Sequence, residues 1–252
     1  MHINHIAIPS DHPRAKSLYI REMLVNGFRR GLVVPEGLIA HGRGEAYDYL
    51  IGERTTNTAQ RAIKAAAAMM LLSSRPIISV NGNTAALCPN TVVELAQVAG
   101  ASIEVNIFYR TEEREKAIKE ELELHGAKKV FGVGSKASAR IPELQSERRR
   151  VDPDGIYAAD TVLVPLEDGD RTEALIKMNK TVIAIDLNPL SRTSRAANIT
   201  IVDNVVRAMP ALVEAARKLR GTTTMSLKKI TDNFDNMKNV QESLKIMKGE
   251  VQ

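Results

Sequence analysis

Several residue types that support common kinds of chemistry are scarce in this sequence. Cys88 is the single cysteine among 252 residues, so an intrachain disulfide is excluded and a reducing, cytoplasmic location is expected. Because Cys88 stands in an apolar context (AALCPN), we expect a buried structural thiol rather than a nucleophile. Tryptophan is absent and aromatic residues make up 4%, which leaves little material for stacking nucleic-acid bases.

Several sequence patterns are also missing. No apolar run approaches the roughly 18 residues of a membrane helix, and the first residues lack the charged and apolar regions of a secretory signal. The P-loop pattern, the HExxH zinc motif, paired cysteines and the G-x-S-x-G elbow are absent as well. These absences exclude P-loop NTPases, common zinc enzymes and α/β-hydrolases, and no membrane association is expected.

The charged residues that are present favour small anionic partners. The chain carries 35 basic and 30 acidic residues, a net charge of +5, with basic clusters near its start and around residues 136–150. Such clusters suit phosphorylated metabolites as well as phosphate backbones. With so few aromatic residues, no nucleic-acid partner is expected. A nucleotide-binding regulatory protein or a nucleic-acid binder stays the alternative interpretation.

Hydrophobic periodicity predicts an α-helical N-terminal section over about residues 10–74. Apolar residues fall at helical spacing in RAKSLYIREMLVNGFRRGLV, and GLIAHGRGEAYDYLIGE reads as a second helical stretch apart from a loop at HGRG. Residues 56–72, rich in alanine and methionine, predict a strong and buried helix.

From residue 75 the pattern changes to short strands alternating with helices. Strands are predicted over 76–80, 102–109, 129–133, 161–165, 181–185 and 198–202, and helices over 90–99, 111–125, 171–178 and 204–220. Capping residues are expected at Asn90 and Thr111. This alternation predicts an α/β fold with a mostly parallel, Rossmann-like, three-layer sheet over about residues 75–220. The whole chain, 1–252, is expected to form a single domain.

The tail, about residues 226–252, places apolar residues at three- and four-residue steps. It is expected to form an amphipathic helix that either docks on the body or makes a subunit contact.

Polar side chains crowd the ends of the last two predicted strands, where ligands bind in parallel sheets. Asp186 ends a buried strand, at a position where a carboxylate accepts hydrogen bonds from ribose hydroxyls. Asn188 and Arg192, with the hydroxyl residues beside them, add donors suited to a polyphosphate. Asn204 follows the next strand and is expected either to read an adenine edge or to cap the following helix. Together these residues favour a nucleotide ligand.

Three glycine-containing segments could receive an anion, and each has a plain structural alternative. Asn81-Gly82-Asn83 is either a ligand-binding pair of amides or a simple Asn-Gly turn. Arg43 in HGRG either reaches a phosphate or lies in a loop between helices. The turn over 132–137 imitates a dinucleotide fingerprint but lacks the acid on a second strand. An anion-binding turn beside Lys136 and Arg140, or a solvated loop, is therefore favoured over NAD binding.

Four long motifs carry a resemblance to a known family. The segments HPRAKSLYIRE, GLIAHGRGEAYDYLIGE, PIISVNGNTAAL and IDLNPLSRTSRAANITIVDN resemble the archaeal phosphopantothenate synthetases, also called 4-phosphopantoate–β-alanine ligases. The similarity runs from about Ser10 to Arg220.

The resemblance implies an ATP-dependent ligation in coenzyme A biosynthesis by a cytoplasmic homodimer. 4-Phosphopantoate would be joined to β-alanine through an acyl-adenylate, with release of AMP and diphosphate and with Mg²⁺ on the ATP. The family's ATP-binding residues correspond here to Arg21, Arg43, Asp186, Leu187, Asn188, Arg192, Thr193, Asn204 and Val205.

The resemblance supplies no residues for the acyl substrate. From the residues alone, Asn81 and Asn83 are expected to bind the polar body of phosphopantoate, and Lys136 or Arg140 its phosphate. No catalytic acid or base and no metal ligand can be named from the sequence.

Overall fold

The protein is described here from a computed structural model that covers residues 8–166 and 168–250. Its chain begins with three helices, α1 (Ala15–Arg29), α2 (Pro35–Leu50) and α3 (Asn57–Leu72). The hydroxyl of Thr56 caps α3 by accepting the Ala59 N–H, and most of the alanines of α3 are buried. The helical N-terminal section and the buried third helix are confirmed.

Within the described residues, the main sheet contains five parallel strands in the order β2-β1-β5-β6-β7. Every side chain of β1 and of β5 is buried, as expected for strands covered on both faces. The fold class, a mostly parallel α/β sheet, is confirmed, and the predicted bounds of β1, β5 and β6 coincide with the observed ones. The strands are β1 (Pro76–Val80), β2 (Ser102–Val105), β5 (Thr161–Pro165), β6 (Thr181–Ile185) and β7 (Ile199–Ile201).

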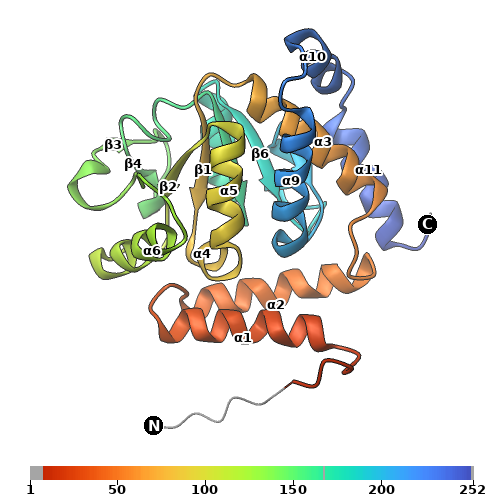
Figure 1. Cartoon of the computed structure of the whole chain (residues 1–252), viewed down its shortest axis with the longest axis horizontal. Coiled ribbons are helices and arrows are strands. Elements are labelled where there is room, and N and C mark those ends of the chain that lie inside the picture. The colour runs from red at the N-terminus through yellow and green to blue at the C-terminus, as the bar shows by residue number, and fades with distance from the viewer. Residues whose placement is uncertain (1–7, 167, 251–252) are drawn as a thin grey trace.

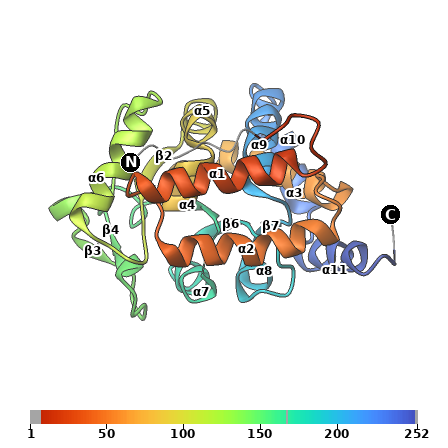
Figure 2. The same ribbon diagram turned by 90° about the horizontal axis from the view of Figure 1, so that it is seen from below.

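Helices cover both faces of this sheet. Figure 2 shows α5 (Pro89–Ala99) and α9 (Val205–Leu219) on one side, and α7 (Gly169–Lys177) and α8 (Arg192–Ala196) on the other. Alternate residues of β1, β5 and β6 enter two separate apolar cores, so that Ile78 joins the α3–α5–α9 side while Ile77 joins the α7 side. The two layers of helices therefore bury the apolar residues on both faces of the strands.

The helices α1 and α2 lie next to each other across one edge of the sheet (Figures 1 and 2). Side-chain contacts identify this as the edge where the parallel strands end, because the Asn83 amide after β1 donates to the Gly37 carbonyl of α2 at 2.8 Å. A side chain at Gly37 would collide with Asn83, since an added Cβ would lie 2.4 Å from its Oδ1. The small residue therefore lets α2 approach the strand ends closely.

Three local predictions were wrong. The HGRG segment is not a loop, because α2 runs through it unbroken. Residues 129–133 do not form a strand, since only Phe131 bridges to Glu104 and Gly132 leaves the extended region at φ +78°. Asn90 is not a cap, because α5 begins at Pro89, a residue suited to the first helical position. Thr111 does cap α6 (Glu112–Leu124), as predicted.

Two short elements were not predicted. Asn81 caps α4 (Gly82–Leu87), so the Asn-Gly segment starts a helix rather than a simple turn. In the segment that follows residue 133, β3 (Ala139–Arg140) pairs antiparallel with β4 (Arg150–Val151), and 3₁₀ turns cover 134–136 and 147–149. Beyond the edge strand β2, these pieces form a small lobe (Figure 1).

The C-terminal tail docks on the body as two helices rather than one. The first, α10 (Thr224–Asp232), and the second, α11 (Asn236–Met247), both contact α3, with Leu227 and Val240 buried. The Asn236 amide donates to the Ser194 and Ala197 carbonyls, which ties the tail to α8. Across the described residues, no helix has the length and apolar character needed to cross a membrane.

Candidate active site

Three strands end beneath α2, and each end contacts a different part of that helix. Asn83, after β1, bonds to Gly37, and Leu187, after β6, lies against Gly44. After β7, the Asn204 amide donates to the Asp48 carboxylate at 2.8 Å. The helix thus spans the strand ends where ligands bind in parallel sheets.

The loop after β6 is organised by the carboxylate of Asp186. One carboxylate oxygen accepts the Asn188 N–H at 2.9 Å and the other accepts the Ser191 hydroxyl. Burial raises the pKa of Asp186, while these hydrogen bonds and the charge of Arg43 act in the opposite direction. The Ser191 hydroxyl also caps α8. Asp186, whose carboxylate was expected to bind ribose, therefore also holds its own loop in place.

The first turn of α8 carries two of the predicted ATP-binding residues. Thr193 is buried, whereas Arg192 is exposed and forms ion pairs with Asp170 and Glu173 of α7. Hydrogen bonds to these two carboxylates raise the pKa of Arg192. Its guanidinium is therefore held against α7 by these two carboxylates.

The start of α9 combines a helix cap with a buried charge network. The Asn204 side chain accepts the Val206 N–H at 3.2 Å, so the capping interpretation of this residue is confirmed. Its amide donates to Asp48, and Arg207 donates to both Asp48 and Asp203. Sequence reasoning missed Asp48 and Arg207, because no local pattern places residues 159 positions apart side by side.

Arg21 and Arg43 come from the two crossing helices. Arg21 donates to both oxygens of the Glu45 carboxylate, at 2.7 to 3.1 Å, and Tyr49 donates to the same group at 3.0 Å. Burial alone would raise the pKa of Glu45, but these hydrogen bonds outweigh it and the pKa is lowered. Arg43 is exposed on α2, and its charge acts on Asp186.

The four residues predicted for the acyl substrate do not form one group. Asn81 donates to the Pro165 carbonyl at 2.8 Å and accepts the Thr84 N–H, which joins the ends of β1 and β5. The Asn83 amide donates instead to the Gly37 carbonyl of α2. Lys136 and Arg140 are exposed in the small lobe beyond β2, and within the described residues no hydrogen bond links them to either asparagine.

Two further observations concern the cysteine and the candidate metal ligands of the described residues. Burial raises the pKa of Cys88 to about 12, in agreement with the predicted structural thiol. Among the described residues, no three His, Cys, Asp or Glu side chains come together in a way that could hold a metal ion. What the strand ends offer is a set of arginines, amides and hydroxyls, which suits binding and orientation of anions.

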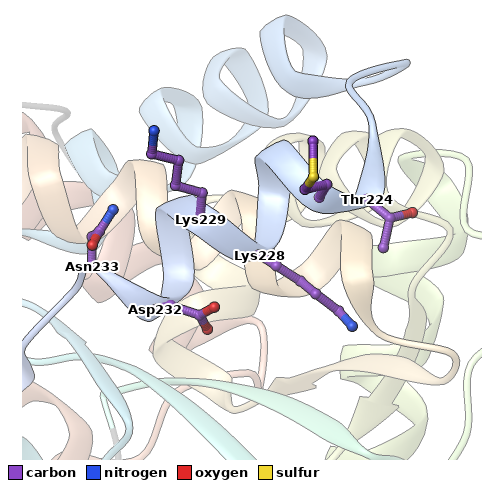
Figure 3. Close-up of a pocket in the computed structure, with 6 residues that line it drawn as sticks. Thr224, Lys228, Lys229, Asp232 and Asn233 are labelled. Carbon is purple, nitrogen blue, oxygen red and sulfur yellow. The ribbon is translucent and has the colours of Figure 1, made fainter.

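A surface hollow elsewhere does not coincide with these residues. It measures about 750 Å³ and is lined by Thr224, Met225, Lys228, Lys229, Asp232 and Asn233 (Figure 3). Five of them belong to α10 and Asn233 follows its last residue, and α10 lies at the opposite end of the molecule from α1 and α2 (Figure 1). The hollow is therefore remote from the strand ends.

Comparison with known sequences places this chain in a protein family. The profile of the phosphopantothenate/pantothenate synthetase family matches residues 58–250, more than half of the chain. The chain belongs to this family. The resemblance carried by the four motifs is thereby confirmed.

Three curated relatives extend the match into the N-terminal helices, and each is named 4-phosphopantoate–β-alanine ligase. The Thermococcus kodakarensis protein is 53% identical over 239 residues, covering 95% of this chain and 91% of the relative. The Methanosarcina mazei protein is 51% identical over 237 residues (94% and 92%), and the Methanospirillum hungatei protein is 51% identical over 212 (84% and 86%). A 239-residue match must begin by residue 14, so it includes Arg21 and Arg43 in this family comparison.

Proposed function

We propose that this protein is an ATP-dependent 4-phosphopantoate–β-alanine ligase of coenzyme A biosynthesis. The observation that carries the proposal is the position of α2 across the strand ends, where it brings Arg43 over Asp186 and Asp48 against Asn204. The near-complete match to relatives of that name supports the choice of substrates. The ATP site proposed from the resemblance lies around α1, α2 and the ends of β6 and β7.

The proposed reaction has two steps. A carboxylate oxygen of 4-phosphopantoate attacks the α-phosphorus of ATP, the bond to the β-phosphate oxygen breaks, and diphosphate leaves with that electron pair. The neutral amine of β-alanine then attacks the acyl carbon of the adenylate. The amine loses a proton to solvent or to a side chain, and AMP leaves with the electron pair of the acyl–oxygen bond. The products are 4′-phosphopantothenate, AMP and diphosphate.

Arrangement of charge, rather than a covalent intermediate on the protein, would supply most of the catalysis. The two reacting groups are both anionic, so the enzyme must hold them together against their repulsion. We propose that Arg21, Arg43 and Arg192 bind the polyphosphate, that Asp186 and Asn188 bind the ribose, and that Asn204 and Val205 lie at the base. The backbone at Leu187 and Thr193 would complete this ATP site.

Mg²⁺ is proposed to enter with ATP, because magnesium in nucleotide sites is bound largely by phosphate oxygens and water. Its contribution when bound would be to neutralise charge on the triphosphate. A homodimer and a cytoplasmic location are further proposals, which rest on the family resemblance. Sedimentation of the purified chain at micromolar concentration would decide the first of these.

The test is a coupled assay of AMP and diphosphate release with the purified full chain. We expect stoichiometric AMP, diphosphate and 4′-phosphopantothenate when ATP, Mg²⁺, 4-phosphopantoate and β-alanine are all supplied. Omitting either acid or amine is the control, and unphosphorylated pantoate tests whether the phosphate is required. Absence of AMP release with the complete mixture would refute the ligase proposal.

A further inference from the structure

The amide of Asn204 is held by two contacts and has two further hydrogen-bonding positions. Its side-chain oxygen accepts the Val206 N–H at 3.2 Å, and its nitrogen donates to the Asp48 carboxylate at 2.8 Å. A carboxamide has two N–H donors and two acceptor lone pairs, so one of each has no partner within the described part of the chain. Asn204 is only 5% exposed. Because buried polar groups are nearly always hydrogen-bonded, we expect this remaining edge of the amide to meet a ligand or water.

Asp48 decides which way this amide faces. An ionised carboxylate only accepts hydrogen bonds, so it binds the nitrogen of an amide and not the oxygen. The backbone N–H of Val206 only donates, and it therefore selects the oxygen. The contact with Asp48 is the shorter of the two and involves a charge, which makes it the stronger constraint.

Arg207 in turn holds Asp48 in place. Its guanidinium donates to both oxygens of the Asp48 carboxylate, and its Nε donates to the Asp203 carboxylate at 2.9 Å. Asp203 also accepts the backbone N–H of Asn204 at 2.7 Å and the Thr55 hydroxyl at 2.6 Å. One guanidinium thus fixes both carboxylates that contact Asn204.

The burial of this network indicates that it does more than attach α2 to α9. The side chain of Asp48 is 5% exposed and that of Asp203 is fully buried. A buried ion pair adds little net stability compared with apolar residues of similar volume, because both ions lose their hydration. What the pair supplies, and an apolar contact could not, is a fixed acceptor beside the Asn204 amide.

The orientation of an amide matters for recognition of a purine base. Along the edge formed by the 6-substituent and N1, adenine offers a donor beside an acceptor, whereas guanine and hypoxanthine offer an acceptor beside a donor. An amide that can turn over fits both patterns, and an amide of fixed orientation fits one of them. With the ribose held at the end of β6, the base cannot turn over in exchange. Along the edge formed by the 6-substituent and N7, the 6-oxo purines offer two acceptors and match the amide in neither orientation.

We propose that Asp48 and Arg207 are positioning residues that make the site selective for adenine nucleotides, by fixing the Asn204 amide toward the base. This rests on the proposed ATP site of the ligase and adds to it a means of base selection. Neither residue touches the nucleotide. Asp48 acts through Asn204, and Arg207 acts through Asp48.

Initial rates of AMP release by the full chain, with ATP, GTP and ITP varied in turn, test this role. Asp48→Asn replaces an obligatory acceptor by an amide that can donate or accept, so the Asn204 side chain is free to turn over. A bidentate contact between an amide and adenine discriminates by about 5- to 150-fold, and the ratio of kcat/KM for ATP to that for ITP should fall within this range. The fall should come chiefly from KM. Because ITP lacks the 2-amino group of GTP, a similar fall for both nucleotides shows that hydrogen bonding, and not exclusion by size, is lost.

A double variant distinguishes positioning from a purely structural role. Asp48→Asn combined with Asn204→Ala should give the same nucleotide ratio as Asn204→Ala alone, because two changes that act through one contact are not additive. A structural role would lower the rates with all three nucleotides together. An unchanged ratio in Asp48→Asn, or a further fall in the double variant, would overturn the proposal. Glu94→Gln removes a carboxylate paired with Arg217 of α9, and this matched control should leave the ratio unchanged.

A second variant keeps the proposal testable if Asp48→Asn does not fold, which a thermal melt will show. Arg207→Lys keeps the positive charge but lacks the planar fork that binds both Asp48 oxygens and Asp203 together. The ATP to ITP ratio should fall by at least about threefold in this variant. An unchanged ratio in a folded Arg207→Lys protein would then count against the proposal.

Equilibrium binding of ATP and ITP, measured by calorimetry without the acyl substrate, separates this proposal from the ligase function. We expect the wild-type chain to bind ATP more tightly than ITP, and Asp48→Asn to lose most of that preference. A wild type that shows this preference but releases no AMP would leave the positioning role standing and refute the ligase. A wild type that releases AMP, with the same preference in Asp48→Asn, would refute the positioning role alone.

Discussion

Replacement of Glu104 by glutamine should change how the stability of this protein depends on pH. Glu104 lies in β2 with no exposed surface, and its carboxylate accepts the N–H groups of Asp152 at 3.1 Å and Ile156 at 2.6 Å. Burial raises its pKa from 4.5 to about 7, even though those hydrogen bonds and the charge of Arg171 act to lower it. The charge of Asp152 adds to the rise.

The sign of the effect follows from where the proton is bound. Below pH 4.5 the carboxyl is protonated in both the folded and the unfolded chain, so it does not affect the balance. Between pH 4.5 and 7 the unfolded chain loses this proton first, and the free energy of unfolding falls as pH rises. The 2.5-unit difference corresponds to about 3 kcal/mol lost by pH 7, as an upper bound.

Glutamine resembles the protonated carboxyl in shape and keeps one acceptor for the backbone N–H groups. Glu104→Gln should therefore remove the part of the slope that Glu104 causes, so that the variant gains stability relative to wild type as pH rises from 5 to 8. Asp186 and Asp203 also have raised pKa values and contribute slopes of the same sign, but both proteins share them. The difference between the two profiles isolates Glu104.

Urea denaturation followed by circular dichroism at pH 5, 6, 7 and 8 provides the measurement. Glu120→Gln on the exposed side of α6 is the matched control, and its profile should run parallel to that of wild type. A stability difference between Glu104→Gln and wild type that stays constant over this range would show that Glu104 is ionised throughout. The reasoning from burial would then be wrong.

Two further predictions concern the proposed ATP site. Arg192→Gln should raise KM for ATP and lower kcat while thermal stability stays nearly unchanged, because exposed ion pairs such as those with Asp170 and Glu173 contribute little; unchanged ATP kinetics would show that the guanidinium only joins α7 to α8. Asn204→Ala should reduce the preference for ATP over GTP in the AMP-release assay and lower the free energy of unfolding by about 0.5–2 kcal/mol through loss of the cap. Lower stability with unaltered nucleotide preference would restrict Asn204 to capping.

Local sequence patterns were reliable wherever burial was continuous along the chain. The runs PIISV, TVLVP and TVIAI predicted β1, β5 and β6 with their observed bounds, because short runs of mainly apolar or β-branched residues suit a strand covered on both faces. The hydroxyl of Thr111 predicted where α6 begins for an equally local reason.

Local patterns failed where distant residues decide the outcome. Gly42 and Gly44 disfavour a helix by about 1 kcal/mol each relative to alanine, yet α2 continues through them. Helix α2 accepts hydrogen bonds from the strand ends, at Gly37 from Asn83 and at Asp48 from Asn204. These contacts compensate for that cost. Neither contact has a counterpart within a few residues of the sequence.

The sequence by itself determined the family, the parallel sheet and the strand ends where Asp186 and Asn204 lie, because each depends on motifs or periodicities read within a short window. Only the tertiary structure decided which charges meet. Asp48 of α2 meets Arg207 of α9 although 159 positions separate them, and this contact depends on how α2 packs across the ends of the strands. Short-range patterns carry no information about such packing, since side chains distant in sequence are brought together by the burial of surfaces elsewhere in the fold.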